Sequence, residues 1–120
     1  MTLTLAMVTC DTDAPLPLAR WWADQTGAEV RDPYEGSYLL VSGGSLPVVL
    51  AFQLVAEPVA GKNRLHLDLF AADLDGEVDR LLDAGASLVE RRGDDSFRWV
   101  TLKDPAGNEF CVAAAADAAG

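Results

Sequence analysis

One histidine occurs in this chain, and its setting is suited to chemistry. His66 lies in the alternating run Leu65-His66-Leu67-Asp68-Leu69, so on a strand the imidazole and the Asp68 carboxylate point to the same side. Such a pair can supply metal ligands, or a general base, because an ordinary imidazole titrates near neutral pH. The same alternation also fits a plain strand with one polar, solvent-facing side, on which Arg64 pairs with Asp68.

Size and charge limit the classes of function. The 120 residues predict a single domain, and an apolar share of 50% is enough for a packed core. The formal net charge of −10 disfavours binding to nucleic acid, which requires clustered Lys and Arg. The charge is better suited to a small ligand that is neutral or cationic.

The location of the protein is predicted from its N-terminus, its hydropathy and its cysteines. The start MTLTLAMVTCDTD lacks the basic region of a signal peptide, and no apolar run approaches the roughly 20 residues that span a bilayer. Cys10 and Cys111 are far apart and form no disulfide framework, so each is interpreted as a thiol packed among apolar groups. We therefore expect a cytoplasmic protein with no membrane contact.

Strand and helix signals follow the same order in both halves of the chain. Period-two stretches predict strands, and Leu18, Trp21 and Trp22 recur at helical spacing in a segment that starts at Pro15 and is ended by Gly27. The strands expected in the first half are 3–10, 28–31, 37–41 and 48–55. Residues 11–13 are expected to supply oxygens that cap the first helix.

The second half repeats this order after a linker at 56–63. Asp73 is placed to cap a helix that Gly85 ends, and Asp104-Pro105-Ala106-Gly107-Asn108 predicts a tight hairpin turn. The strands expected here are 64–71, 87–91, 97–102 and 109–114, and residues 115–120 form a low-complexity tail.

A shift of sixty residues aligns Asp13 with Asp73 and Arg20 with Arg80, and it places Ala6 opposite His66. Independent signals that recur in register indicate an internal duplication. We predict an α+β domain made of two βαβββ modules, about 3–55 and 64–114.

The duplicated pattern resembles the vicinal oxygen chelate superfamily, which includes glyoxalases, extradiol dioxygenases and bleomycin resistance proteins. The resemblance rests on RLHLDLFAADLD and above all on TLKDPAGNEFCV, which is similar to the glyoxalase-like subgroup. It implies a curled, cup-like mixed sheet with a helix outside each module. It also implies a homodimer, which would cover exposed sheet edges.

The resemblance implies metal-ligand positions at Ala6, near Gln53, at His66, and at Glu109 or Cys111. Alanine cannot bind a metal, and a cysteine stands where the family pattern has a glutamate, so we expect no cofactor. The alternative is a divalent metal (Zn, Ni, Mn or Fe) held by His66, Gln53 and Glu109.

Aromatic side chains give the expected cup a second use. Trp99, Tyr38 and Phe52 can stack on a flat or apolar guest. The full set of expected ligand-binding residues is Tyr38, Phe52, Gln53, His66, Asp68, Trp99, Glu109 and Cys111, with His66 as the candidate catalytic group. Each aromatic residue has an equally simple role in the core.

Three functions remain open on the sequence. The preferred one is binding or sequestration of a small organic molecule without the full metal set. The second is a metal-dependent lyase, isomerase or dioxygenase, and the third is an interaction module with no ligand. Because side chains that line a site vary on one scaffold, the pattern does not identify the ligand, nor does it decide whether the protein is an enzyme.

Overall fold

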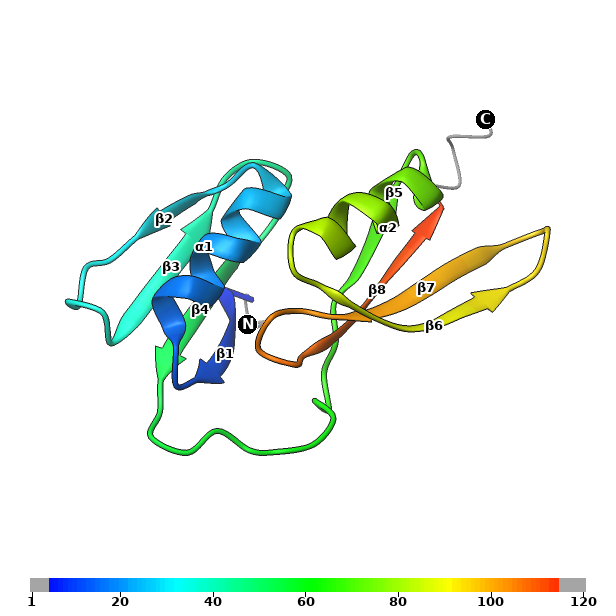
Figure 1. Ribbon diagram of the computed structural model, residues 1–120. Helices are drawn as coiled ribbons and strands as arrows, with labels where there is room; N and C mark the ends of the chain where they lie inside the picture. Colours follow the sequence, from blue (N-terminus) through cyan, green and yellow to red (C-terminus); the bar gives the residue numbers. More distant parts are fainter. Residues whose placement is uncertain (1–4, 115–120) are drawn as a thin grey trace, which may run out of the picture. The chain divides into compact units, whose positions relative to one another are not determined.

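A computed structural model describes residues 5–114. Two compact units make up the chain, and the boundary between them, at Ala60 and Gly61, falls inside the predicted linker. Each unit contains one helix and one four-stranded sheet (Figure 1). In the part of the chain that is described, no helix is long and apolar enough to cross a membrane.

The first unit has the order β-α-β-β-β. Its elements are β1 (Met7–Thr12), α1 (Pro15–Thr26), β2 (Glu29–Arg31), β3 (Tyr38–Ser42) and β4 (Val49–Leu54). The strands lie side by side in the order β1-β4-β3-β2, with β1 parallel to β4 and the other neighbours antiparallel.

The second unit repeats this topology. Its elements are β5 (Asp68–Ala71), α2 (Leu74–Asp83), β6 (Ser87–Gly93), β7 (Arg98–Lys103) and β8 (Glu109–Ala114). The order is β5-β8-β7-β6, and again only the pair β5–β8 is parallel. Two mixed sheets, each with one helix, confirm the predicted α+β class and the βαβββ repeat.

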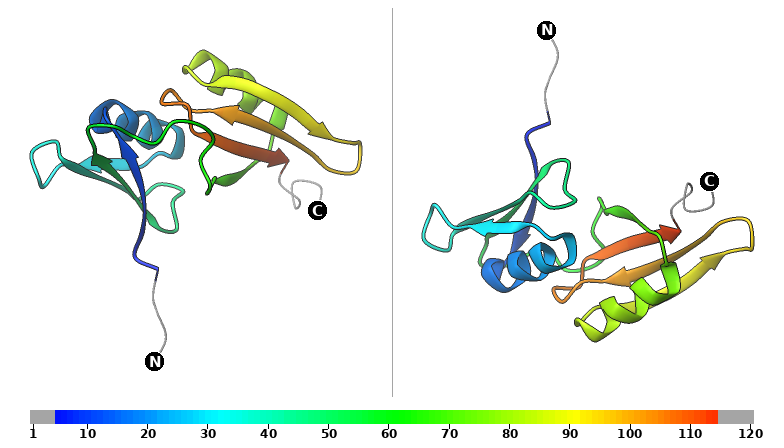
Figure 2. Two further views of the ribbon diagram at one scale, coloured as in Figure 1. Left: turned by 90° about the horizontal axis from the view of Figure 1, so that it is seen from below. Right: turned by 90° about the horizontal axis from the view of Figure 1, so that it is seen from above.

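Each helix packs on one face of its own sheet, as two further views show (Figure 2). Strand alternation sends every second side chain toward the helix. In the first unit these include Leu39, Val41, Leu50 and Phe52, and in the second Val100, Leu102, Phe110 and Val112, all buried. The opposite face of each sheet has no helix from its own unit over it, so polar and reactive side chains can be placed there.

The helix starts show one expectation confirmed and one wrong. Asp73 caps α2, where its carboxylate accepts from the Gly76 amide at 3.1 Å. In contrast, Ala14 occupies the cap of α1 and makes no side-chain capping bond, while the Thr12 hydroxyl accepts from the Ala14 amide at 3.1 Å. Pro15 opens α1 as predicted, because an amide at that position would have no helical partner.

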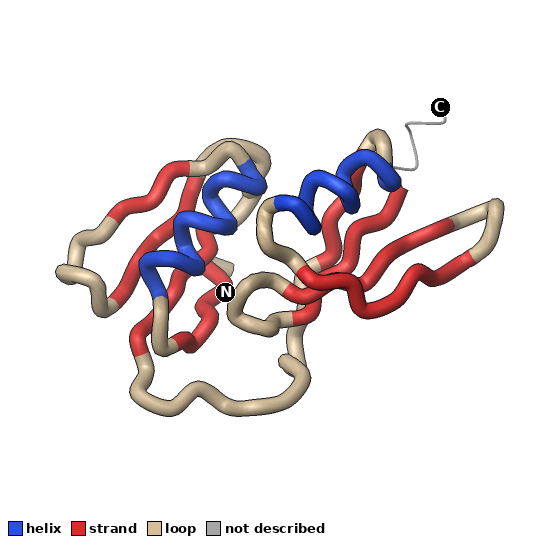
Figure 3. Tube along the Cα trace, viewed as in Figure 1, coloured by secondary structure: helices blue, strands red, loops and turns tan. Residues whose placement is uncertain are grey.

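Several strand limits differ from the expected ones by one to four residues (Figure 3). The largest difference concerns β5, which begins at Asp68 rather than at residue 64, so His66 precedes the strand. Its path is still tied to β8, because the Cys111 amide donates to the Leu67 carbonyl at 2.9 Å. The start predicted at residue 3 and the tail predicted at 115–120 lie outside the described residues.

The strand registers also refine the alignment of the two modules. Since Ala14 caps α1 and Asp73 caps α2, the helices start one residue away from the shift of sixty. With this adjustment Thr9 of β1 corresponds to Asp68 of β5. Thr9 pairs with Ala51 and Asp68 pairs with Cys111, so Ala51 corresponds to Cys111. Met7, rather than Ala6, is therefore the counterpart of His66.

The predicted turn between β7 and β8 is organised by one buried carboxylate. Asp104 is only 4% exposed, and its Oδ1 accepts from the Ala106 amide at 3.0 Å and the Asn108 amide at 2.9 Å. The Asn108 side-chain amide also donates to Oδ2 at 3.1 Å. Gly107 takes a positive φ of 92°, which closes the turn.

Replacing this carboxylate is expected to destabilise the hairpin. Asp104→Ala leaves the amides of Ala106 and Asn108 without this acceptor, so the free energy of unfolding should fall by roughly 2 kcal/mol. Urea denaturation followed by circular dichroism measures the loss. Asp95→Ala, at the exposed tip between β6 and β7, is the matched control and should change stability little. Equal losses in the two variants would contradict a special role for Asp104.

Candidate functional site

The side of the second sheet that faces away from α2 carries the candidate site, and we call this side the open face. Register pairs place its residues in two neighbouring rows across the strands β5, β8, β7 and β6. The first row is Phe70, Ala113, Trp99 and Arg92, and the second row is Asp68, Cys111, Thr101 and Glu90. Alternation points all eight side chains in the same direction.

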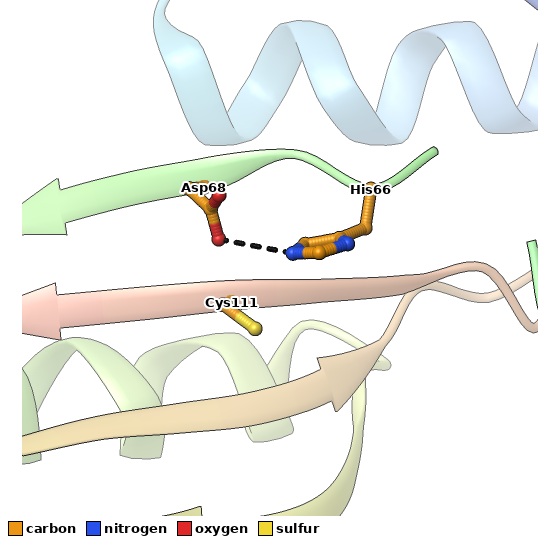
Figure 4. A group of neighbouring side chains, drawn as sticks. All are labelled: His66, Asp68 and Cys111. Atoms are coloured by element: carbon orange, nitrogen blue, oxygen red, sulfur yellow. Dashed lines mark ion pairs between the residues drawn. The ribbon is translucent and has the colours of Figure 1, made fainter. Parts of the chain in front are cut away.

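Three potential ligand groups meet at one end of the second row. The Nε2 atom of His66 lies 3.3 Å from Oδ1 of Asp68. One nitrogen of His66, one carboxylate oxygen of Asp68 and the Sγ atom of Cys111 all lie within 4.8 Å of one another (Figure 4). We call these three residues the His–Asp–Cys group. Asp68 pairs with the imidazole, and no ion pair joins it to Arg64 among the described residues.

Asn63 holds the segment that carries His66. Its side-chain amide donates to the carbonyl of Glu109 at 3.0 Å, and its Oδ1 accepts from the Glu109 amide at 2.8 Å. A second donation reaches the Leu65 carbonyl at 2.6 Å. The side chain thus substitutes for a strand partner just before β5 begins, which places the backbone of His66 beside β8.

Cys111 is held from the other side by a short polar chain. Its Sγ atom lies 3.4 Å from the Thr101 hydroxyl, which in turn accepts from Nε of Arg92 at 3.1 Å. The Arg92 guanidinium also pairs with the Glu90 carboxylate. Thr101 is only 4% exposed even though it belongs to the open face. The thiol is therefore half-buried and has a hydrogen-bonding partner on β7.

The arrangement is better suited to binding a shared cation than to nucleophilic catalysis. In a triad the base uses one ring nitrogen for the nucleophile and the other for the carboxylate. In the His–Asp–Cys group a single nitrogen is within 4.8 Å of both partners. Imidazole, carboxylate and thiolate together form a donor set of the kind that zinc accepts.

The other residues predicted in this unit lie near the group without joining it. The Glu109 carboxylate is on the same side of β8 but approaches the Lys62 ammonium, at 4.0 Å. Trp99 lies in the first row, and its ring contacts that of Phe97 with centroids 5.7 Å apart.

The turn before Phe97 is closed by Asp94, whose pKa is lowered by hydrogen bonds from the Ser96 hydroxyl and amide and from the Phe97 amide.

Three predicted residues belong to the first unit and have different surroundings. Tyr38 and Gln53 pair across β3 and β4 on the side away from α1, and the Tyr38 hydroxyl bonds to the Thr9 hydroxyl at 3.1 Å. Phe52 is 3% exposed and points toward α1. Its place in the core shows why alternation matters, because neighbouring residues of one strand serve opposite faces.

Sequence reasoning missed Asn63 and Thr101. Asn63 was assigned to the linker, since its partner Glu109 is 46 residues away and no local pattern connects them. Thr101 lies in a predicted strand between apolar neighbours, and strand parity with Trp99 was the one available signal that it shares the face of the site.

Comparison with known proteins now bears on this geometry. A family model described as the glyoxalase-like domain matches residues 7–113. The chain belongs to this family. Membership places it in the glyoxalase, bleomycin resistance protein and dioxygenase superfamily, as its motifs suggested. The search of curated proteins found no match.

Solved structures share the fold at low identity. A glyoxalase/bleomycin resistance protein/dioxygenase family enzyme from Burkholderia phytofirmans has a TM-score of 0.72 at 16% identity, covering 91% of this chain and 96% of that one. The fosfomycin resistance protein FosX from Mesorhizobium loti has a TM-score of 0.71 at 17% identity, and the match covers 96% of this chain and 94% of FosX. Lactoylglutathione lyase from Agrobacterium tumefaciens has a TM-score of 0.66 at 18% identity, and the match covers 92% of each chain.

The metal site that the family resemblance implies can be tested on the residues of this glyoxalase-like domain. The counterparts of His66 and Cys111 in the first module are Met7 and Ala51, by the refined register. A thioether is a weak ligand and alanine is none. Within residues 5–114, the second module alone offers a plausible donor set, in which Asp68 takes part although the sequence placed it outside the metal positions.

We expect Asn63 to determine how well the His–Asp–Cys group is ordered. Asn63→Ala removes both bonds to the Glu109 backbone, so unfolding free energy should fall by about 1–2 kcal/mol and the Glu109 amide should exchange faster with deuterium. Glu57→Ala, in the same linker and exposed, is the control and should leave the exchange rate unchanged. If Asn63→Ala exchanges like the parent protein, Asn63 does not anchor this segment.

Proposed function

We propose that this protein binds a small organic molecule, and that it does so without the complete metal set of its family. The observation that carries the proposal is the unequal pair of modules. Met7 and Ala51 stand where His66 and Cys111 stand in the second module. Loss of ligands from one module removes part of the family's metal set, while the aromatic and polar side chains of the second module can still bind a small molecule by stacking and hydrogen bonds.

The open face supports binding rather than a purely structural role. It combines a half-buried Trp99, an exposed Phe70 and the polar groups of the second row. Small-molecule sites typically consist of apolar surface with a few fixed polar groups. The structural neighbours carry the names of a lyase and of an antibiotic resistance protein, so the shared fold alone does not favour one activity.

The remaining properties of the protein follow from the same proposal. Neither Cys10 nor Cys111 forms a disulfide, which suits a reducing cytoplasm. We also expect a homodimer and a single domain built from both modules, with no nucleic-acid partner because of the acidic charge.

Ligand binding should not depend on added metal. Small aromatic compounds titrated in excess chelator are expected to quench tryptophan fluorescence and raise the melting temperature, with about 2.7 kcal/mol of stabilisation at a hundredfold excess over Kd. Trp99→Phe should retain the thermal shift and lose most of the quenching, whereas the buried Trp21 and Trp22 remain as internal reference. Binding that appears only after metal is added would contradict the proposal.

A second candidate function is favoured by the His–Asp–Cys group. In this alternative the protein is a metal-dependent enzyme in which His66, Asp68 and Cys111 hold a divalent ion such as zinc. When bound, such an ion would polarise an oxygen of the substrate or lower the pKa of a bound water. Thr101 would keep the thiol in place, and Asn63 would hold the histidine segment.

Cobalt(II) titration distinguishes the two candidates. If the group binds a divalent ion through sulfur, an intense near-ultraviolet band from the thiolate–cobalt bond appears and saturates at one equivalent. Cys111→Ser should remove the band, and Cys10→Ser, which changes the cysteine of the first unit, should not. The metal-free proposal expects no saturable band in the parent protein, so a band with this pattern would overturn it.

A further inference from the structure

The first row of the open face contains a small residue between two aromatic ones. Ala113 of β8 pairs with Phe70 of β5 on one side and with Trp99 of β7 on the other. Phe70 is 73% exposed, and Trp99 and Ala113 are half-buried. Because Ala113 ends at Cβ, the row has a low floor flanked by two rings.

The width of this notch suits a flat ring. Neighbouring strands lie about 4.8 Å apart, so the strands that carry Phe70 and Trp99 are separated by about 10 Å. Stacked aromatic rings have centroids about 4.5–7 Å apart, so one inserted ring can contact both walls. The ring of Phe97 packs on Trp99 at 5.7 Å and supports the indole.

Charges beside the notch favour a positive ligand. Asp68 and Phe70 lie on the same side of β5, and the Asp68 side chain is 75% exposed. The cation of the row, Arg92, is engaged by the Glu90 carboxylate and the Thr101 hydroxyl. A cation held over aromatic faces next to a carboxylate gains from both contacts.

We propose that Phe70, Ala113 and Trp99 form a subsite that sandwiches a planar aromatic cation, with its charge directed to Asp68. The inference rests on the proposed small-molecule function and specifies the chemical class of the ligand. The apolar ring enters between the two aromatic walls, and the positive group lies along β5 toward the His–Asp–Cys group.

Two probes share one fused ring system and differ in charge, and a third keeps the positive charge without the flat ring. 9-Aminoacridine is flat and cationic at neutral pH, acridine-9-carboxylate is flat and anionic, and cyclohexylammonium is cationic without a flat ring. Calorimetric titration of the full chain, in excess chelator, measures Kd for each. We expect 9-aminoacridine to bind at least tenfold more tightly than either of the other two.

Substitutions distinguish binding in a defined notch from nonspecific adsorption of the ligand to the surface. Phe70→Ala should weaken 9-aminoacridine about five- to tenfold by removing one wall. Ala113→Leu adds apolar surface but fills the floor, so it should weaken binding at least as much, whereas nonspecific adsorption would increase. Asp68→Asn should lower affinity for the cation and not lower that for the anion, because the repelling carboxylate is removed.

Tyr34→Ala is the matched control, because Tyr34 is also an exposed aromatic residue, 61% exposed, but belongs to the first unit. It should leave every Kd unchanged. Circular dichroism and melting temperature verify that each variant is folded, which is expected since the substituted side chains are not buried.

Two results would overturn the inference. One is 9-aminoacridine affinity that survives both Phe70→Ala and Ala113→Leu, and the other is equal affinity for the cationic and anionic rings. If no acridine binds while other compounds do so in chelator, the subsite inference fails and the proposed function stands. If no compound of any class binds, both fail.

Discussion

The parallel pairing of β5 with β8 is the constraint on which the candidate site depends. These strands are far apart in the sequence, and the crossover through α2 brings them together in register, with Asp68 opposite Cys111. A parallel pair requires such a crossover, and the helix of the crossover must cover one face of the sheet. The other face is then left for chemistry. A slip of one residue in β5 would turn Asp68 toward α2 and separate it from Cys111.

The sequence was sufficient for the fold because its signals are local and occur twice. Proline at a helix start, glycine at a helix end and period-two strands each specify an element without distant information. The turn at Asp104 was recognisable for the same reason, since its carboxylate bonds to amides within four residues. The cap of α1 was missed because three oxygen-bearing residues stood together, and only the backbone path decides which residue takes the cap.

The site was harder to predict because it consists of contacts between distant segments. Alternation placed His66 and Asp68 on one side, but the approach of Cys111 depends on register. That register also moved the counterpart of His66 from Ala6 to Met7. The role of Asn63 could not be predicted for a related reason. Its side chain bonds to the backbone of a distant strand, and such a contact produces no periodic pattern in the sequence. Phe52 illustrates the reverse error, in which an aromatic residue in a promising strand belongs to the core.

The two modules share a topology but differ in what their uncovered faces carry. The second presents imidazole, carboxylate, thiol and aromatic groups, while the corresponding positions of the first include Met7 and Ala51. A duplicated scaffold lets one half change without loss of the fold, because the helix-facing residues form much of each core. The proposed function accordingly uses the open face of the second sheet.

Binding at the open face is tested most directly by nuclear magnetic resonance of the labelled chain in excess chelator. A ligand that binds there is expected to shift the amide and side-chain signals of Phe70, Trp99, Cys111 and Ala113, and to leave those of Val78 and Leu81 on the buried side of α2 unchanged. Shifts confined to the helix side, or shifts at the open face that vanish when chelator is present, would contradict metal-free binding at this surface.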